Sequence, residues 1–235
     1  METSGKDEET RTAQVVFEWK DSNGKPHVRI PKVGPRGLEI EGSDEDLPDF
    51  FYIAASQIIG SSENAGRFSE MRRAGRGPEF VELLNREYKW IRDLDIEVVA
   101  GSPVIFAKAR DSQDMLPLAY ISGGINRVVS VMLCIASTDR SVVLVDEIEN
   151  GIFHTHHKSL WRAILALIRN YEGQIFATTH SYELLEALVQ AAGDKLDDIA
   201  LWRLERDDNG RPTLFQFAGD ILKDAIKHGA EARGG

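Results

Sequence analysis

The sequence predicts an α/β domain with a parallel sheet in its second half and antiparallel β-hairpins in its first half. The run Ser141–Val145 is mostly apolar without alternation, which is typical of a strand covered on both faces in a parallel sheet. From this run onward, strand and helix patterns alternate, as in parallel β units. Earlier in the chain, turn signals at Asn23–Gly24 and Gly101–Ser102 each separate two strand-like runs, which indicates hairpins.

The first half of the chain mixes hairpin, linker and helix patterns. Its polar start lacks the apolar residues that a packed structure needs, and Pro78 suits the first turn of a helix. The stretch 56–77 favours neither a helix nor a strand. The predicted segments are a disordered tail (Met1–Thr12), the hairpin Gln14–Lys20 with His27–Lys32, a loop or linker (Gly34–Pro48), a strand (Phe50–Ala55), a helix (Glu79–Leu94) and the hairpin Asp95–Ala100 with Pro103–Lys108.

The second half alternates helices and strands. One predicted helix is apolar almost all round and is therefore expected to be buried, and Ser181 can cap another. Trp161 and Trp202 are predicted to lie in the core. The predicted segments are the buried helix Ile125–Ala136, the strand Ser141–Val145, the helix His156–Asn170, the strand Gly173–Thr178, the helix Tyr182–Ala192, the strands Ile199–Glu205 and Pro212–Phe217, and the helix Ile221–Ala230.

The amino-acid composition favours a protein with a packed core and argues against a nucleic-acid-binding, disulfide-bonded or membrane-spanning protein. Hydrophobic residues make up 42% and charged residues 28%, so a packed core is expected. The net charge of −10 argues against broad nucleic-acid binding, although it leaves room for a local basic patch. The single cysteine, Cys134, excludes an intrachain disulfide and fits a reducing compartment. No apolar run is long enough to span a membrane and the start does not read as a signal peptide, so we expect a cytoplasmic protein.

Two adjacent acids, Asp146 and Glu147, follow the predicted strand Ser141–Val145. Open α/β sheets bind their ligands at the carboxyl ends of their strands, which is where this pair falls. One carboxylate there can hold Mg²⁺ and the other can take a proton from an attacking water. The alternative interpretation is a buried strand that ends in two solvated acids.

Two further segments have residue types suited to phosphate chemistry. Ser122, Gly123 and Gly124 precede the predicted buried helix, where glycines and a hydroxyl let a phosphate approach the helix start. The alternative is a glycine turn with a serine cap. His180 follows a predicted strand directly before a helix, where its imidazole could donate to a γ-phosphate. The alternative is a hydrogen-bonded core histidine.

The order of these motifs resembles a known family. The segments ISGGINR, VVLVDEIENG, LWRAI and QIFATTHS are similar to the carboxyl-terminal lobe of ABC-type ATPases, a P-loop NTPase fold. Among ABC-type ATPases, these segments resemble the branch that includes the SMC-like and overcoming-lysogenization-defect-like proteins. Within that branch, they are most similar to bacterial and archaeal AAA-family ATPases of unknown or defence-related role. The resemblance covers roughly residues 50–233. We therefore expect this lobe at 50–235, after the disordered tail at 1–12 and a hairpin and linker at 13–49 that the residue patterns predict.

The resemblance implies a role for each candidate residue. Ser122, Gly123 and Gly124 would form the signature segment that contacts the γ-phosphate of ATP held by the other subunit. Asp146 would coordinate Mg²⁺ and Glu147 would be the general base, as in the Walker B motif. His180 would be the switch histidine. ATP is then the substrate and Mg²⁺ the cofactor, and the partner is a second copy or an effector protein.

The sequence contains no G-x-x-x-x-G-K-[ST] motif, so nothing in it matches the Walker A phosphate cradle. We therefore expect a fragment, a truncated product or one half of a split enzyme, completed by a Walker A-bearing half in cis or in trans. Two alternatives stay open. One is a non-catalytic interaction module, and the other is a metal-dependent phosphoesterase with Asp146, Glu147 and Glu149 as ligands.

Overall fold

The computed structural model of the protein divides into two units, residues 1–47 and 48–235. The predicted disordered tail, Met1–Thr12, and the turn at Asn23–Gly24 lie outside the described residues. The described residues are 17–20, 25–34, 37–41, 49–56, 60–110, 112–207 and 210–227.

The first unit contains a three-stranded antiparallel sheet in the order β1-β2-β3. The pairing of β1 (Phe17–Lys20) with β2 (Pro26–Gly34) confirms the first predicted hairpin. The prediction of a loop over Gly34–Pro48 was wrong in part, because β3 (Gly37–Glu41) pairs with β2 there. Its sequence, GLEIE, alternates apolar and acidic residues, which is the period of a strand.

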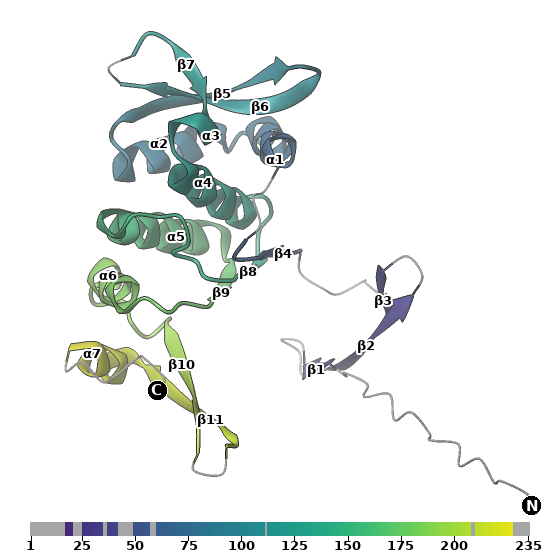
Figure 1. Ribbon diagram of the computed structural model, residues 1–235, viewed down its shortest axis with the longest axis vertical. Helices are drawn as coiled ribbons and strands as arrows, with labels where there is room; N and C mark the ends of the chain where they lie inside the picture. Colours follow the sequence, from purple (N-terminus) through teal and green to yellow (C-terminus); the bar gives the residue numbers. More distant parts are fainter. Residues whose placement is uncertain are drawn as a thin grey trace, which may run out of the picture. The chain divides into compact units, whose positions relative to one another are not determined.

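The second unit is built on a three-stranded parallel sheet in the order β4-β8-β9 (Figure 1). Its strands are β4 (Phe50–Ile53), β8 (Val142–Val145) and β9 (Gln174–Ala177), and both pairings are parallel. Helices lie between and beside these strands, so the predicted α/β class is confirmed.

Two antiparallel sheets accompany the parallel one. The first has the order β5-β6-β7, and its β5-β6 pairing confirms the second predicted hairpin. The second is the hairpin β10-β11. The strands are β5 (Ile91–Val99), β6 (Ser102–Ala109), β7 (Met115–Pro117), β10 (Ala200–Arg206) and β11 (Pro212–Ala218).

The helices of the second unit pack in succession, with contacts from α1 to α4, α4 to α5, α5 to α6 and α6 to α7 (Figure 1). As predicted, α4 is buried along most of its length, and so is its Cys134. None of the described helices has both the length and the apolar character needed to cross a membrane. The helices are α1 (Ser61–Arg73), α2 (Gly77–Glu87), α3 (Leu118–Ile121), α4 (Gly123–Ala136), the 3₁₀ turn η1 (His154–His156), α5 (His157–Tyr171), α6 (Tyr182–Ala192) and α7 (Gly219–Lys227).

The predicted helix Glu79–Leu94 was wrong in its second half, because α2 ends at Glu87 and β5 begins at Ile91. Ile91 follows the apolar Leu84 and Tyr88 at helical spacing, and Leu94 lies three residues after Ile91, so the sequence pattern suits one face of a helix. In the structure a β-bulge after Ile91 shifts the strand register, and both side chains are buried although they belong to a strand.

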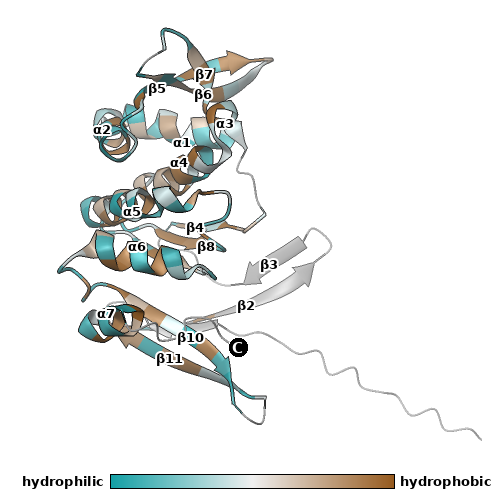
Figure 2. Ribbon diagram, turned by 60° about the vertical axis from the view of Figure 1, so that its left-hand side comes forward, coloured by the Kyte–Doolittle hydropathy of each residue, from teal (hydrophilic) through white to brown (hydrophobic). Residues whose placement is uncertain are grey.

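The prediction that the apolar strand is covered on both faces was wrong in part, because Val142 and Leu144 on one face of β8 are only half-buried. Val143 and Val145 of β8 are buried, with α4 packing against this strand. The other face of the sheet carries three large exposed side chains, Phe50 (64% exposed), Tyr52 (57%) and Phe176 (48%). Figure 2 shows that hydrophobic residues run along the whole of β8. In the described part of the chain, one face of this parallel sheet is therefore uncovered.

Candidate functional site

The two candidate acids lie at the carboxyl end of β8, where the hydroxyl of Thr178 links them. Thr178 Oγ1 donates to Asp146 Oδ1 at 2.6 Å and accepts from the backbone N–H of Glu147 at 2.9 Å. Thr178 itself follows β9, the neighbouring strand. This short chain of hydrogen bonds fixes one oxygen of Asp146 and leaves the second without a hydrogen bond from the described residues.

Glu147 has a strained backbone. Its φ of +45° is in the left-handed region, which a residue with a side chain adopts at a cost of the order of 1–3 kcal/mol. The bonds on either side hold it there: its N–H donates to Thr178, and its C=O accepts from Arg127 Nη2 at 3.2 Å. Such strain is concentrated at functional sites, because it aims a side chain that an extended strand would point elsewhere.

Arg127, in the second turn of α4, holds the backbone around these acids. Its Nη2 donates to the carbonyl of Asp146 at 2.8 Å as well as to that of Glu147, and its Nη1 donates to those of Ala54 and Ala55 at 3.4 and 3.5 Å. Burial lowers the pKa of this guanidinium, while the nearby carboxylates raise it. One side chain thus connects α4, the end of β8 and the end of β4.

His180 is exposed, so the interpretation as a core histidine was wrong. Its backbone N–H donates to Glu149 Oε1 at 2.9 Å, and Ser181, the next residue, caps α6 by accepting from the N–H of Leu184 at 3.1 Å. The imidazole makes no hydrogen bond within the described part of the chain. Glu149 therefore positions the segment that carries the imidazole of His180. This histidine follows Thr178 by two residues, and Thr178 contacts the two acids.

The predicted signature segment, Ser122–Gly124, lies at the start of α4. Ser122 is its N-cap and accepts from the N–H of Ile125 at 3.4 Å, so the capping role predicted as the alternative is present. Gly123 is exposed with open space around its Cα, whereas Gly124 packs against the turn that follows the acids. A Cβ built on Gly124 would lie 2.5 Å from the carbonyl oxygen of Gly151. Gly124 is thus required for packing, and Gly123 is free to face a ligand.

We expect Gly124→Ala to destabilise the domain by roughly 1–3 kcal/mol, because the new methyl group meets a backbone oxygen. Gly123→Ala is the matched control and should change stability by less than about 1 kcal/mol, because nothing lies within 4 Å of its Cβ position. Urea unfolding of both variants measures the difference. Equal midpoints would contradict the close contact between the signature segment and Gly151.

The donor set at this edge fits Mg²⁺ only in part. Mg²⁺ is usually bound through one or two carboxylates together with substrate phosphates and water, and Asp146 supplies one such carboxylate. Within the described ranges, no group of three or more His, Cys, Asp or Glu side chains could hold a metal by itself. A site completed by nucleotide phosphates therefore agrees with these residues better than an all-protein metal centre.

Sequence reasoning missed two residues of this arrangement, Thr178 and Arg127. Thr178 stood inside a motif that we read for its histidine alone. Arg127 carried a clearer signal, since it is the only charged residue in the helix Gly123–Ala136, which is otherwise largely buried. A cation in such a place needs partners, and here they are four backbone carbonyls.

A family described as an AAA ATPase domain matches residues 59–185, more than half of the chain. The chain belongs to this AAA ATPase family. The matched residues include the signature segment, both acids and His180. The recognition of an AAA-family ATPase from the sequence motifs is thereby confirmed.

Two curated relatives of this AAA ATPase domain align over part of its length. One is an ATP/GTP phosphatase of Helicobacter pylori (strain ATCC 700392 / 26695), 26% identical over 106 residues, which are 43% of this chain and 29% of that protein. The other is the ATP-binding cassette sub-family A member 6 of Homo sapiens, 29% identical over 100 residues, which are 43% of this chain and 6% of that protein. The alignments thus span less than a third of each relative.

Among solved structures, the domain is similar to an SmcHead bound to the C-winged helix domain of ScpA. The TM-score is 0.57 at 14% sequence identity, and the alignment covers 90% of this chain and 75% of that chain. At this identity the similarity concerns the fold. It agrees with the arrangement of a parallel sheet, flanking helices and antiparallel hairpins described above.

Proposed function

We propose that this AAA ATPase domain supplies the signature segment, the Walker B acids and the switch histidine to a composite ATP site. A Walker A-bearing half, in cis or in trans, would complete the site, and two such heads would close on ATP. The observation that carries the proposal is the Asp146–Thr178–Glu147 chain, because it orients the Asp146 carboxylate and holds the backbone of Glu147 at the edge of a parallel sheet, where nucleotide phosphates bind.

The geometry supports a division of labour between the two acids. Asp146, oriented by Thr178, would hold Mg²⁺, which neutralises charge that develops on the transferred phosphate. Glu147, held in its strained conformation, would orient the attacking water and accept its proton. His180 is exposed beside them and would contact the γ-phosphate. Ser122 and Gly123, at the start of α4, would contact the nucleotide of the opposite head.

The uncovered face of the parallel sheet supports the need for a second half. Strands of a parallel sheet are normally covered on both faces, whereas Phe50, Tyr52 and Phe176 are exposed here. Fully burying an aromatic side chain of this kind gives about 1.5–3 kcal/mol. A Walker A half that packs on this face would remove the three side chains from water and bring a phosphate cradle to the same sheet.

An ATPase assay tests the proposal. The purified chain alone is expected to show no ATP turnover above the level of its Glu147→Gln variant, because it has no Walker A motif. Adding the Walker A-bearing half, whether encoded in the same gene or beside it, should restore Mg²⁺-dependent hydrolysis. Failure of the combined halves to bind ATP would favour the non-catalytic interaction module. Phosphodiester cleavage with Mn²⁺ and without ATP would favour the phosphoesterase.

A further inference from the structure

A pocket of about 440 Å³ lies at the carboxyl end of α2, and none of its lining residues belongs to the segments around Asp146 and Glu147. It is lined by Glu82, Asn85, Arg86, Lys89 and Arg110. These side chains come from α2, from the turn that follows it and from the residue after β6. Three of the five are cations and one is an acid, in a chain whose net charge is −10.

The cations of this pocket are poorly neutralised. Arg86 lies 3.8 Å from Glu82, and both side chains are more than half exposed, so their attraction is weak and screened by salt. Within the described residues, neither Lys89 nor Arg110 has an ion pair. Glu87, the next carboxylate, is paired elsewhere, 4.0 Å from Arg162 of α5.

The helix dipole alone can explain why Lys89 and Arg86 lie at the carboxyl end of α2. Cations near the carboxyl end of a helix interact favourably with its dipole. Arg110 does not belong to α2, however. Its backbone N–H donates to the carbonyl of Trp90 at 2.7 Å, which holds the end of β6 against the turn that carries Lys89. The fold therefore adds a third cation that the end of the helix does not require.

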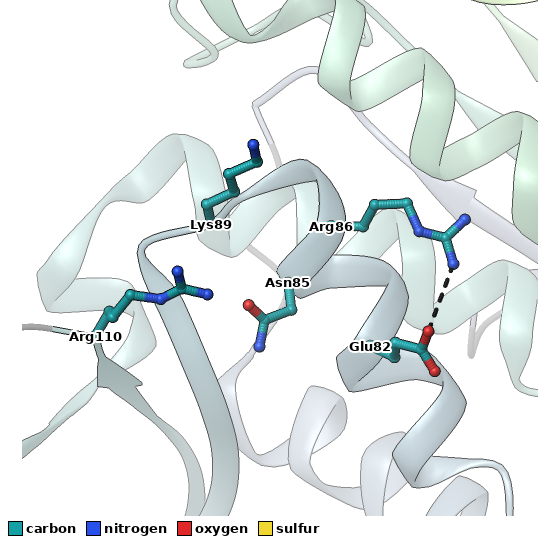
Figure 3. A pocket seen from close by; sticks show the side chains of 5 residues that line it. All are labelled: Glu82, Asn85, Arg86, Lys89 and Arg110. Carbon is teal, nitrogen blue, oxygen red and sulfur yellow. Dashed lines mark ion pairs between the residues drawn. The ribbon is translucent and has the colours of Figure 1, made fainter.

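The pocket also has a fixed polar wall. Asn85 Nδ2 donates to the carbonyl of Arg92 at 2.9 Å, so this side chain is held in place. Figure 3 shows Asn85 and Arg110 extending toward one another, whereas Arg86 is turned toward Glu82 and the Lys89 side chain extends away from Arg110. The planar Arg110 guanidinium can bind two phosphate oxygens at once, and a Lys ammonium adds a compact charge.

We propose that this pocket binds a phosphate group, with Arg110 as its main ligand and the exposed Lys89 turning from its present direction to add a second positive charge. An incoming phosphate would also compete with Glu82 for Arg86. The same chemistry fits a small free phosphate compound and a phosphate of a nucleic-acid backbone, and binding measurements distinguish the two sources. The pocket is separate from the proposed ATP site, so this proposal does not depend on that function.

The experiment compares two double variants of the whole chain. Lys89→Ala/Arg110→Ala removes the two unpaired cations of the pocket. Arg73→Ala/Arg140→Ala removes two positive charges from well-exposed arginines elsewhere, 73% and 79% exposed, and so matches the first variant in net charge. Thermal melting checks that both variants fold. The probes are inorganic pyrophosphate, followed by calorimetry, and a short single-stranded oligonucleotide, followed by fluorescence anisotropy.

For pyrophosphate, the pocket variant is expected to lose about tenfold or more in affinity, the effect of one charged hydrogen bond, while the control keeps the wild-type value. That result identifies a small phosphate compound as the source. If the ligand is a nucleic-acid backbone, the oligonucleotide affinity should fall in the same variant. A plot of the logarithm of the binding constant against the logarithm of the salt concentration should then become less steep, by roughly 0.7 for each lost phosphate contact. Absence of binding to the wild type, or equal binding by the two variants, would overturn the proposal.

Discussion

When the Walker A half is supplied, replacing Glu147 by Gln is expected to lower ATP hydrolysis by about 10²-fold or more, as for the loss of a positioned general base. The amide keeps the shape of the side chain, and the backbone bonds from Thr178 and Arg127 do not depend on the carboxylate. ATP binding should therefore survive. Trapped ATP would hold two heads together, and the dimer should persist in size-exclusion chromatography.

The neighbouring substitution, Asp146→Asn, is expected to act differently. Its carboxylate would hold Mg²⁺, so its loss should weaken Mg²⁺–ATP binding, and the ATP-dependent dimer should disappear. Glu97→Gln, which neutralises an exposed acid on β5, is the control and should leave both quantities unchanged. Identical behaviour of Glu147→Gln and Asp146→Asn in the dimer assay would refute the division of labour between the two acids.

Trp161→Ala is expected to destabilise the domain by roughly 3–5 kcal/mol. The indole is only 6% exposed on the inner face of α5, and its Nε1–H donates to the carbonyl of Leu184 in α6 at 3.1 Å. Truncation would leave a cavity between two packed helices and would remove the indole donor from that carbonyl. The free energy of unfolding, measured in urea, gives the effect directly.

Trp202 provides a matched control for this measurement. We predicted it to be a core residue, but it is 47% exposed on β10, so the prediction was wrong. Trp202→Ala should change stability by less than about 1 kcal/mol, as surface substitutions usually do. Equal losses for the two tryptophans would mean that the contact between α5 and α6 contributes less than its burial implies.

Sequence patterns predicted best the elements whose signals agree with one another. The predicted helix Tyr182–Ala192 has the bounds of α6, because Ser181 caps its start and Gly193 ends it. The helix over His156–Asn170 was displaced by one residue at each end. In α6 a start signal and a stop signal coincide with the apolar periodicity, whereas in α5 the periodicity alone indicated the helix, since its N-cap His156 makes no side-chain capping bond.

Elements that depend on contacts distant in sequence were not predictable in the same way. α1 has an N-cap glycine without a capping side chain and only two large buried apolar residues, Phe68 and Met71, so its pattern is weak. The roles of Thr178 and Arg127 depend on bringing β9 and α4 to the end of β8. No single residue in the sequence indicates that these elements come together in the fold. The order of the motifs predicted which segments matter, but not the hydrogen bonds between them.

The parallel sheet has a consequence for handling the isolated chain. In the described part, β4 and β9 are its outer strands, and their outward backbone groups pair with no other strand. Open edges next to exposed aromatic side chains are templates for edge-to-edge aggregation. Self-association of the purified chain would then arise without nucleotide. In the dimer assay, only the dimeric fraction that disappears when ATP is withheld can be assigned to the head-to-head contact.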